Sequence, residues 1–252
     1  MPPDPWILSA LFAAGGIAGF VDAIAGGGGL ITVPALLAAG LPPRLALGTN
    51  KLQSSCGTLL ATWQYQQAGL IAWRPLAAGV AITFVAALAG AWTVTRIDPG
   101  FLRRLIPFLL LAIAACVALR PDLGRDPRPA RLSRPAFHLL FGLALGFYDG
   151  FFGPGTGSFW MMAGVLVLGL DFRQATGHTK AMNLASNLAS LLWFVLAGQV
   201  DLAAGAIMAA GQLLGARLGA GLVITRGVRL IRPIFLTMVL ALTAKLFWDA
   251  FG

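Results

Sequence analysis

Long uncharged apolar runs alternate with short polar or proline-rich stretches along most of this chain. Five of these runs span residues 23–43, 52–73, 75–95, 150–170 and 181–200. Each is about 20 residues long, which is the length of helix that crosses about 30 Å of hydrocarbon, whereas the strands of a membrane barrel are about half as long. The pattern therefore predicts an all-α integral membrane protein.

Each half of the chain offers five apolar segments, separated by Pro and Gly. They lie at 5–24, 29–40, 45–70, 74–95 and 101–119, and then at 135–152, 157–169, 174–199, 202–225 and 233–251. The link between the halves is polar and rich in Pro and Arg. We therefore expect a first membrane repeat at residues 1–119, a linker at 120–135 and a second membrane repeat at 136–252.

Two stretches are built on the same plan, namely GFVDAIAGGGGLITVP at 19–34 and GFYDGFFGPGTGSFWM at 146–161. Each carries one aspartate followed by a glycine-rich break. The correspondence continues downstream at one constant spacing, in the pairs Gly48 and Gly177, Lys51 and Lys180, Gly69 and Gly198, Gly90 and Gly219, and Arg103 and Arg232. Duplicated, interrupted hydrophobic helices are typical of secondary transporters.

The arginines between the apolar runs predict how the two halves are oriented. If each half crosses the membrane an odd number of times, the halves are inverted, the linker is cytoplasmic, and both chain ends are periplasmic. Ten arginines then lie inside and four outside, whereas parallel halves would place six inside and eight outside. The positive-inside rule favours inversion, with eight to ten membrane segments. The sequence leaves open whether the short second segment of each half crosses fully or is re-entrant.

Composition agrees with a bilayer protein, since 58% of residues are hydrophobic, 11% are charged and the mean hydropathy is +0.82. The net charge of +9 is explained by these loop arginines, so we expect no nucleic-acid partner. Cys56 and Cys116 stand singly in apolar runs, and no phosphate-binding loop, HExxH or GxSxG motif is present. We therefore expect neither catalytic residues nor a metal or cofactor.

Glycines four residues apart place small side chains on one face of a helix. Such rows are Gly15 and Gly19, then Gly142, Gly146 and Gly150, and finally Gly211, Gly215 and Gly219. We expect other helix backbones to approach closely there.

Glycine runs within a membrane segment interrupt the helix, which is tolerated where the backbone is buried in protein or faces water. The helices that restart after the breaks offer free N–H groups and a positive dipole end to an anion. The predicted anion-binding positions of the two breaks are Gly26, Gly27, Gly28 and Gly29, and Gly153, Gly155, Thr156, Gly157 and Ser158. The alternative is that these glycines only allow tight packing.

Charged and polar side chains near the breaks extend this candidate site. Asp22 and Asp149 occupy matched positions and would either couple a proton or anchor the glycine loops. Lys51 and Lys180 would neutralise an anion, or else extend to the membrane interface. Hydrogen-bond donors within a turn of each lysine complete the predicted set: Asn50, Ser54, Thr179 and Asn183.

Two further residues have open roles. His178 would either relay a proton or be a structural histidine, and its pairing with Ser158 is only a weak sign of a membrane hydrolase. Arg217 would pair with a carboxylate, line the path, or extend to the interface.

Several long motifs resemble one known family. The strings GFVDAIAGGGGLITVPALL, GTNKLQ, GFYDGFFGPGTGSFW, GHTKAMNLASN and GQLLGARLG are similar to the YfcA-like branch of the TauE/SafE sulfite exporter family, nearly from end to end. The resemblance implies a transporter of the bacterial inner membrane, whose relatives are associated with sulfite, sulfonates and other small sulfur-containing anions.

The resulting hypothesis is a secondary transporter of small anions that works by alternating access, with proton coupling as an option. Its partners would be the anionic substrate and the lipid bilayer, and a homo-oligomer is left open. Alternatives are an anion channel, or a non-transporting membrane subunit that docks an enzyme of sulfur metabolism.

Overall fold

A computed structural model of the chain describes residues 5–102, 105, 108 and 129–226. Within these residues the chain forms eight helices of ten or more residues and no strand, which confirms the all-α prediction. The helices are α1 (Pro5–Ala25), α2 (Gly29–Ala38), α3 (Pro43–Gln67), α4 (Trp73–Val94), α6 (Arg134–Phe151), α7 (Thr156–Leu166), α8 (Phe172–Leu196) and α9 (Leu202–Arg226). The fifth segment of each half, most of the linker, and Arg103 and Arg232 fall outside the described residues.

The helix ends follow from local chemistry. Proline stands at the start of α3, where a missing N–H costs nothing, and Asp171 caps α8 by accepting a hydrogen bond from the Gln174 N–H at 2.8 Å. The left-handed glycines Gly69 and Gly198 follow the ends of α3 and α8, at equivalent positions of the two halves.

The polar side chains of α3 and α8 point inward while large apolar side chains cover the outside. α1, α4 and α9 up to Thr225 are long and apolar enough to cross a membrane. On α3 and α8 the buried face carries Thr, Ser, Asn and Lys, whereas Leu59, Leu188 and Leu196 are exposed. This distribution suits a multi-pass membrane protein, because lipid rather than water surrounds the outer face.

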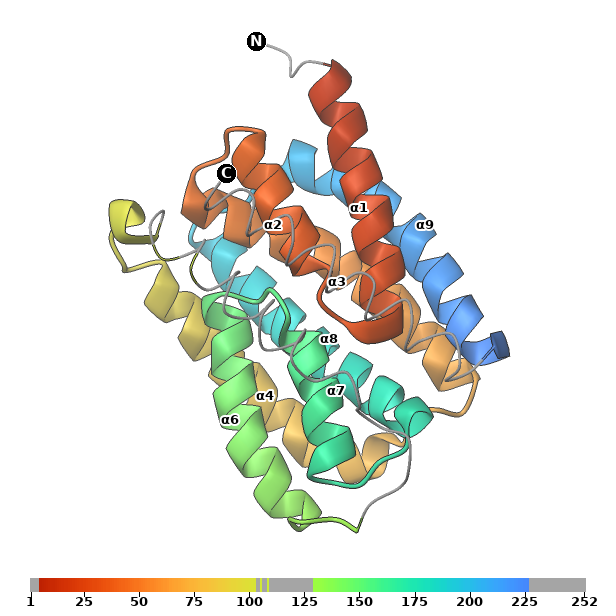
Figure 1. The fold of residues 1–252 in the computed structure, drawn as a ribbon. Helices are drawn as coiled ribbons and strands as arrows, with labels where there is room; N and C mark the ends of the chain where they lie inside the picture. The colour runs from red at the N-terminus through yellow and green to blue at the C-terminus, as the bar shows by residue number, and fades with distance from the viewer. Residues whose placement is uncertain (1–4, 103–104, 106–107, 109–128, 227–252) are drawn as a thin grey trace.

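The short second helix of each half turns back at the glycine break (Figure 1). α1 runs down the view and α2 returns upward, whereas α6 runs upward and α7 returns downward. The two hairpins therefore enter from opposite ends of the molecule, and their tips meet near its middle. α2 has 10 residues and α7 has 11, which corresponds to about 15–17 Å of helix. Because that is about half of the hydrocarbon thickness, neither helix is long enough to cross it alone, which favours the re-entrant alternative for the second segments.

Each half packs mainly against the other half. α1 and α3 lie against α9, while α6 and α8 lie against α4, so the same contacts appear when the halves are exchanged. The predicted glycine rows are at these contacts: Gly15 and Gly19 face the backbone of Met208 and Gln212, and Gly150 faces that of Ala87. Any larger side chain there would strike a neighbouring backbone, so the prediction of close helix packing is confirmed.

Candidate functional site

The aspartate and the lysine that each repeat carries form ion pairs that cross between the halves. The Lys51 ammonium of the first half lies 2.7 Å from Asp149 Oδ1 of the second half. The Lys180 ammonium of the second half lies 2.8 Å from Asp22 Oδ2 of the first half. Both lysines are buried, with 1% and 0% of their surface exposed, so the alternative of interfacial lysines is wrong.

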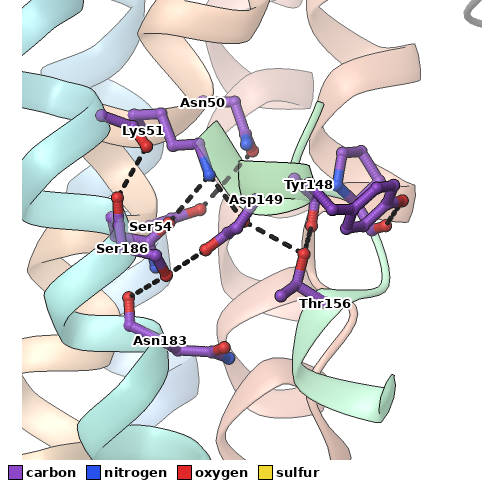
Figure 2. Close-up of polar contacts among 12 residues, drawn as sticks. Asn50, Lys51, Ser54, Tyr148, Asp149, Thr156, Asn183 and Ser186 are labelled. Atoms are coloured by element: carbon purple, nitrogen blue, oxygen red, sulfur yellow. Dashed lines mark hydrogen bonds and ion pairs between the residues drawn. The ribbon is translucent and has the colours of Figure 1, made fainter. Parts of the chain in front are cut away.

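Asp149 is held from several sides (Figure 2). Besides Lys51, it accepts hydrogen bonds from Thr156 Oγ1 at 3.1 Å and from Ser186 Oγ. Lys51 also donates to Asn187 Oδ1 at 3.2 Å. The side chain of Asp149 is 4% exposed, so this ion pair sits in a fully connected polar network.

Asp22 has fewer partners and is more open. Lys180 donates to its carboxylate and to its backbone carbonyl, and the Gly28 N–H approaches Oδ1 at 3.4 Å. Its side chain is 14% exposed. The difference has a cause in the sequence, because the spacing of the downstream repeat pairs places Gly57 opposite Ser186 and Gly27 opposite Thr156. Asp22 therefore lacks both hydroxyl donors that hold Asp149.

The tips of the two hairpins touch each other. Gly26, Gly27, Gly153 and Gly155 all have positive φ angles, between 74° and 100°, which glycine adopts without steric cost. A Cβ atom on Gly26 would lie only 2.5 Å from the Gly157 Cα, so backbone meets backbone there. α2 and α7 begin at these tips and no side chain caps either helix, which leaves their positive ends at the centre of the protein.

Side chains from α3 and α8 complete the surroundings. Asn50 Oδ1 accepts hydrogen bonds from Thr32 Oγ1 at 2.5 Å and from Gln53 Nε2 at 2.8 Å. Asn187 Nδ2 donates to Thr58 Oγ1 at 3.3 Å. Thr58 and Asn187 are equivalent positions of the two repeats, so the halves meet at this contact.

A small polar cavity of about 20 Å³ lies between these elements. Its lining combines both aspartates with hairpin-tip residues and with polar residues of α3 and α8: Asp22, Gly27, Gly29, Asn50, Lys51, Ser54, Asp149, Gly153, Gly155, Thr156, Gly157, Asn183 and Asn187. We call this the central cavity. A void of this size holds about one water molecule.

The central cavity contains most of the predicted site residues and leaves out a few. Lys180 reaches it only through its partner Asp22, Gly26 and Gly28 belong to the hairpin tip next to it, and Thr179 does not line it. Ser158 Oγ instead donates to the carbonyls of Ala25 and Gly26, and so fastens one hairpin tip to the other.

His178 and Arg217 do not join this cluster. The His178 ring faces His138 and lines a different cavity, so it forms no dyad with Ser158. Arg217 is exposed on α9 and makes no hydrogen bond or ion pair with the described residues.

Sequence reasoning missed Asn187, Ser186 and Thr32. Asn187 was detectable in principle, because it follows Asn183 by four residues on the same helix face and corresponds to the polar Thr58 in the first half. Ser186 has no polar counterpart, so the repeat comparison could not find it.

Comparisons with known proteins agree with this architecture. The family model of the sulfite exporter TauE/SafE matches residues 11–246. The chain belongs to the TauE/SafE family. It is 42% identical to "Probable membrane transporter protein YfcA" of Escherichia coli strain K12, over 99% of this chain and 93% of the relative. It is 45% identical to a "Probable membrane transporter protein" of Haemophilus influenzae, over 96% of this chain and 95% of the relative.

These TauE/SafE relatives support a membrane transporter as the class of protein, and they are consistent with a protein that is not an enzyme. No solved structure matches the chain.

The central cavity of this TauE/SafE member has the chemistry of an anion site that is internally neutralised. Two ammonium groups and two uncapped helix N-termini supply positive charge, and two carboxylates balance the ammonium groups. Removing either partner of a buried ion pair leaves an uncompensated charge, which costs several kcal/mol. A group that took the place of one carboxylate would therefore have to carry a negative charge to keep the cluster neutral.

Proposed function

We propose that this protein is a secondary transporter of small anions, favouring sulfur-containing anions such as sulfite and sulfonates, and that it works by alternating access. The proposal rests on two aspartate–lysine ion pairs. In each of them the aspartate and the lysine come from different halves, and both pairs lie at the tips of two opposed hairpins. The name of the family model supports sulfite as a test substrate.

The ion pair between Asp22 and Lys180 supplies a route to proton coupling. When Asp22 takes up a proton, its carboxyl group no longer balances Lys180, and an anion at the hairpin tips restores neutrality. The proton and the anion then bind together. Asp22 is the better candidate because it has fewer hydrogen-bond donors than Asp149 and is more exposed.

The central cavity has room for about one water molecule, so we expect the hairpin tips to separate when a larger anion binds. Because the two hairpins enter from opposite ends, withdrawal of one tip would open the cavity toward one side of the membrane, and withdrawal of the other toward the opposite side. This sequence of movements is alternating access.

Proteoliposome flux tests the proposal. We expect saturable uptake of labelled sulfite, sulfoacetate or taurine, stimulated by a pH gradient and showing counterflow. Unitary currents in voltage-clamped bilayers would instead identify an anion channel. Absence of flux for all of these anions, with and without a pH gradient, would overturn the transporter.

We also propose the bacterial inner membrane as the location, with the arginine-rich end cytoplasmic. Arg74, Arg131, Arg134 and Arg173 lie at the end of the molecule where α4, α6 and α8 begin. Arg44 donates to the Ile97 carbonyl at the opposite end, next to Arg96. The positive-inside rule supports this orientation.

A further inference from the structure

A second and much larger cavity lies at the arginine-rich end of the molecule. Its volume is about 520 Å³, and it shares no lining residue with the central cavity. It is formed by the α3–α4 loop, the first turns of α6 and α8, and the segment between α7 and α8: Ala68, Gly69, Leu70, Ala72, Pro75, Leu76, Arg134, His138, Leu168, Leu170, Asp171, Arg173, Gln174 and His178. We call this the vestibule.

The inner wall of the vestibule is a pair of buried histidines. Nε2 of His138 and Nε2 of His178 lie 3.2 Å apart, and the rings are stacked. Phe137 and Trp160 contact His178 from the interior, with ring centroids 5.7 Å away in each case. His178 is 5% exposed, and its Nδ1 has no hydrogen-bond partner among the described residues.

The outer part of the vestibule carries unpaired positive charge. Arg134 and Arg173 line it, and neither guanidinium forms a hydrogen bond or ion pair within the described ranges. Asp171 is the single carboxylate of the lining, and its Oδ1 is occupied by the Gln174 N–H. The N-terminal ends of α4, α6 and α8 add positive dipole ends at the same place. The vestibule therefore attracts anions.

Apolar side chains make up much of the remaining wall. Leu70, Leu76, Leu168 and Leu170 line the vestibule alongside the arginines and histidines. A bare inorganic anion cannot use this apolar surface. An anion that carries a short hydrocarbon group can place its charge on the guanidinium groups and its carbons against the leucines.

The equivalent positions of the first half are filled by packing. The repeat places Leu11 opposite His138, Arg44 opposite Arg173, and Thr49 opposite His178. Leu11 packs with Met208, Arg44 donates to the Ile97 carbonyl, and Thr49 Oγ1 accepts from the Asp201 N–H at 2.9 Å. The duplication alone therefore does not account for the vestibule, because the equivalent positions of the first half have packing partners instead.

We propose that the vestibule is a separate binding site for a small organic anion with a short apolar group, such as an alkanesulfonate, on the cytoplasmic side of the transport path. The proposal rests on the proposed function for its place on the path. It assigns the vestibule to organic rather than inorganic anions, because the charged rim and the leucine wall occur together only here among the described cavities.

The test is isothermal titration calorimetry of 1-propanesulfonate into the purified full-length protein in a neutral detergent. We expect saturable binding to the wild type, and at least a tenfold increase in Kd for the double variant Arg134→Gln, Arg173→Gln. The control Arg74→Gln, Arg131→Gln removes the same charge at the same end from exposed residues outside the lining, and we expect less than a twofold change. An Arg134→Lys, Arg173→Lys variant keeps both charges and should retain most of the binding.

Three outcomes would overturn the vestibule site. If the test and control variants lose affinity equally, the anion is attracted by the general surface potential and not by the two lining arginines. If sulfite binds as tightly as propanesulfonate, the leucines do not contribute to binding. Binding of short-chain phosphatidylglycerol without binding of propanesulfonate would identify a lipid site. Flux is measured separately in liposomes. Binding without flux contradicts the proposal that the protein is a transporter. Flux without arginine-dependent binding contradicts only the proposal of a vestibule site.

Discussion

At the scale of residues, the two ion pairs are chemically alike but differ in their surroundings. Asp149 receives two hydroxyl hydrogen bonds in addition to its lysine, whereas the corresponding first-half positions are glycines and leave Asp22 with fewer donors. The extra hydrogen bonds fix the Asp149 side chain in place, whereas Asp22 is less constrained and more exposed. We therefore propose that Asp149 holds the halves together and that Asp22 takes part in the proton-linked step.

This assignment predicts different effects of the two neutralising substitutions. We expect Asp22→Asn to lower stability less than Asp149→Asn does, because Asp22 is more exposed and has fewer partners, and its remaining anion flux should no longer respond to a pH gradient because Lys180 has lost its carboxylate partner. We expect Asp149→Asn to lower thermal stability. Flux assays at two pH gradients and unfolding midpoints in detergent measure both. A pH response that persists in Asp22→Asn and disappears in a folded Asp149→Asn would reverse the roles.

The ion pair of Lys51 and Asp149 gives a second prediction about stability. Lys51→Gln leaves a buried carboxylate without its cation, and we expect a loss of about 3–5 kcal/mol. The double variant Lys51→Gln, Asp149→Asn is neutral and should recover most of that loss. Thermal unfolding of the wild type and the three variants forms a double-mutant cycle. Additive losses in the cycle would show that the pair is not coupled.

At the scale of elements, the central cavity depends on two hairpin tips whose backbones touch. Gly26 meets Gly157, and Gly29 meets Pro154 with a distance of 3.0 Å from its would-be Cβ to the Pro154 Cα. At Gly26 no other residue type fits, because the two backbones approach closely and φ is positive. The breaks are therefore packing contacts as well as the starts of α2 and α7, and their predicted role in anion binding stays a prediction.

Gly26→Ala tests the contact between the tips. The added methyl group strikes the Gly157 backbone, so we expect loss of flux and a lower unfolding midpoint. Gly40→Ala is the matched control, because Gly40 also has a positive φ, of 91°, but has nothing within 4 Å of the added atom. The control should show only the strain of the left-handed backbone, about 1 kcal/mol. Equal effects of the two substitutions would mean that the tip contact is unimportant.

At the scale of the whole molecule, each half completes the other. α1 packs against α9 and α4 against α6, and each lysine pairs with the aspartate of the opposite half. Neither half alone would neutralise its own buried charges. The opposed hairpins support the inverted arrangement that the arginine distribution predicts, and they divide the molecule into two ends with different charge.

Membrane orientation is tested by labelling cysteines in intact cells. In a background of Cys56→Ala and Cys116→Ala, we expect Arg96→Cys to react with a membrane-impermeant maleimide from outside. We expect Arg131→Cys to react only after lysis. Both positions are exposed and lie at opposite ends of the molecule. The reverse pattern of labelling would place the arginine-rich end in the periplasm.

The sequence by itself determined the class of protein, the duplication and the positions of the breaks. These properties are local, because the length of an apolar run and the backbone freedom of glycine act within one segment. Most residues of the central cavity were also predicted, since the repeat marks matched polar positions such as Asn50, Lys51 and Asn183.

Only the tertiary structure decided which charges meet. Lys51 and Asp149 are 98 residues apart, and Lys180 and Asp22 are 158 residues apart, so the pairing depends on how helices from the two halves pack. The same holds for the vestibule, where His138 and His178 come together from α6 and α8. Apolar periodicity gives each helix an inner face, but it does not specify the partner across that face, because many helix arrangements bury the same apolar surface.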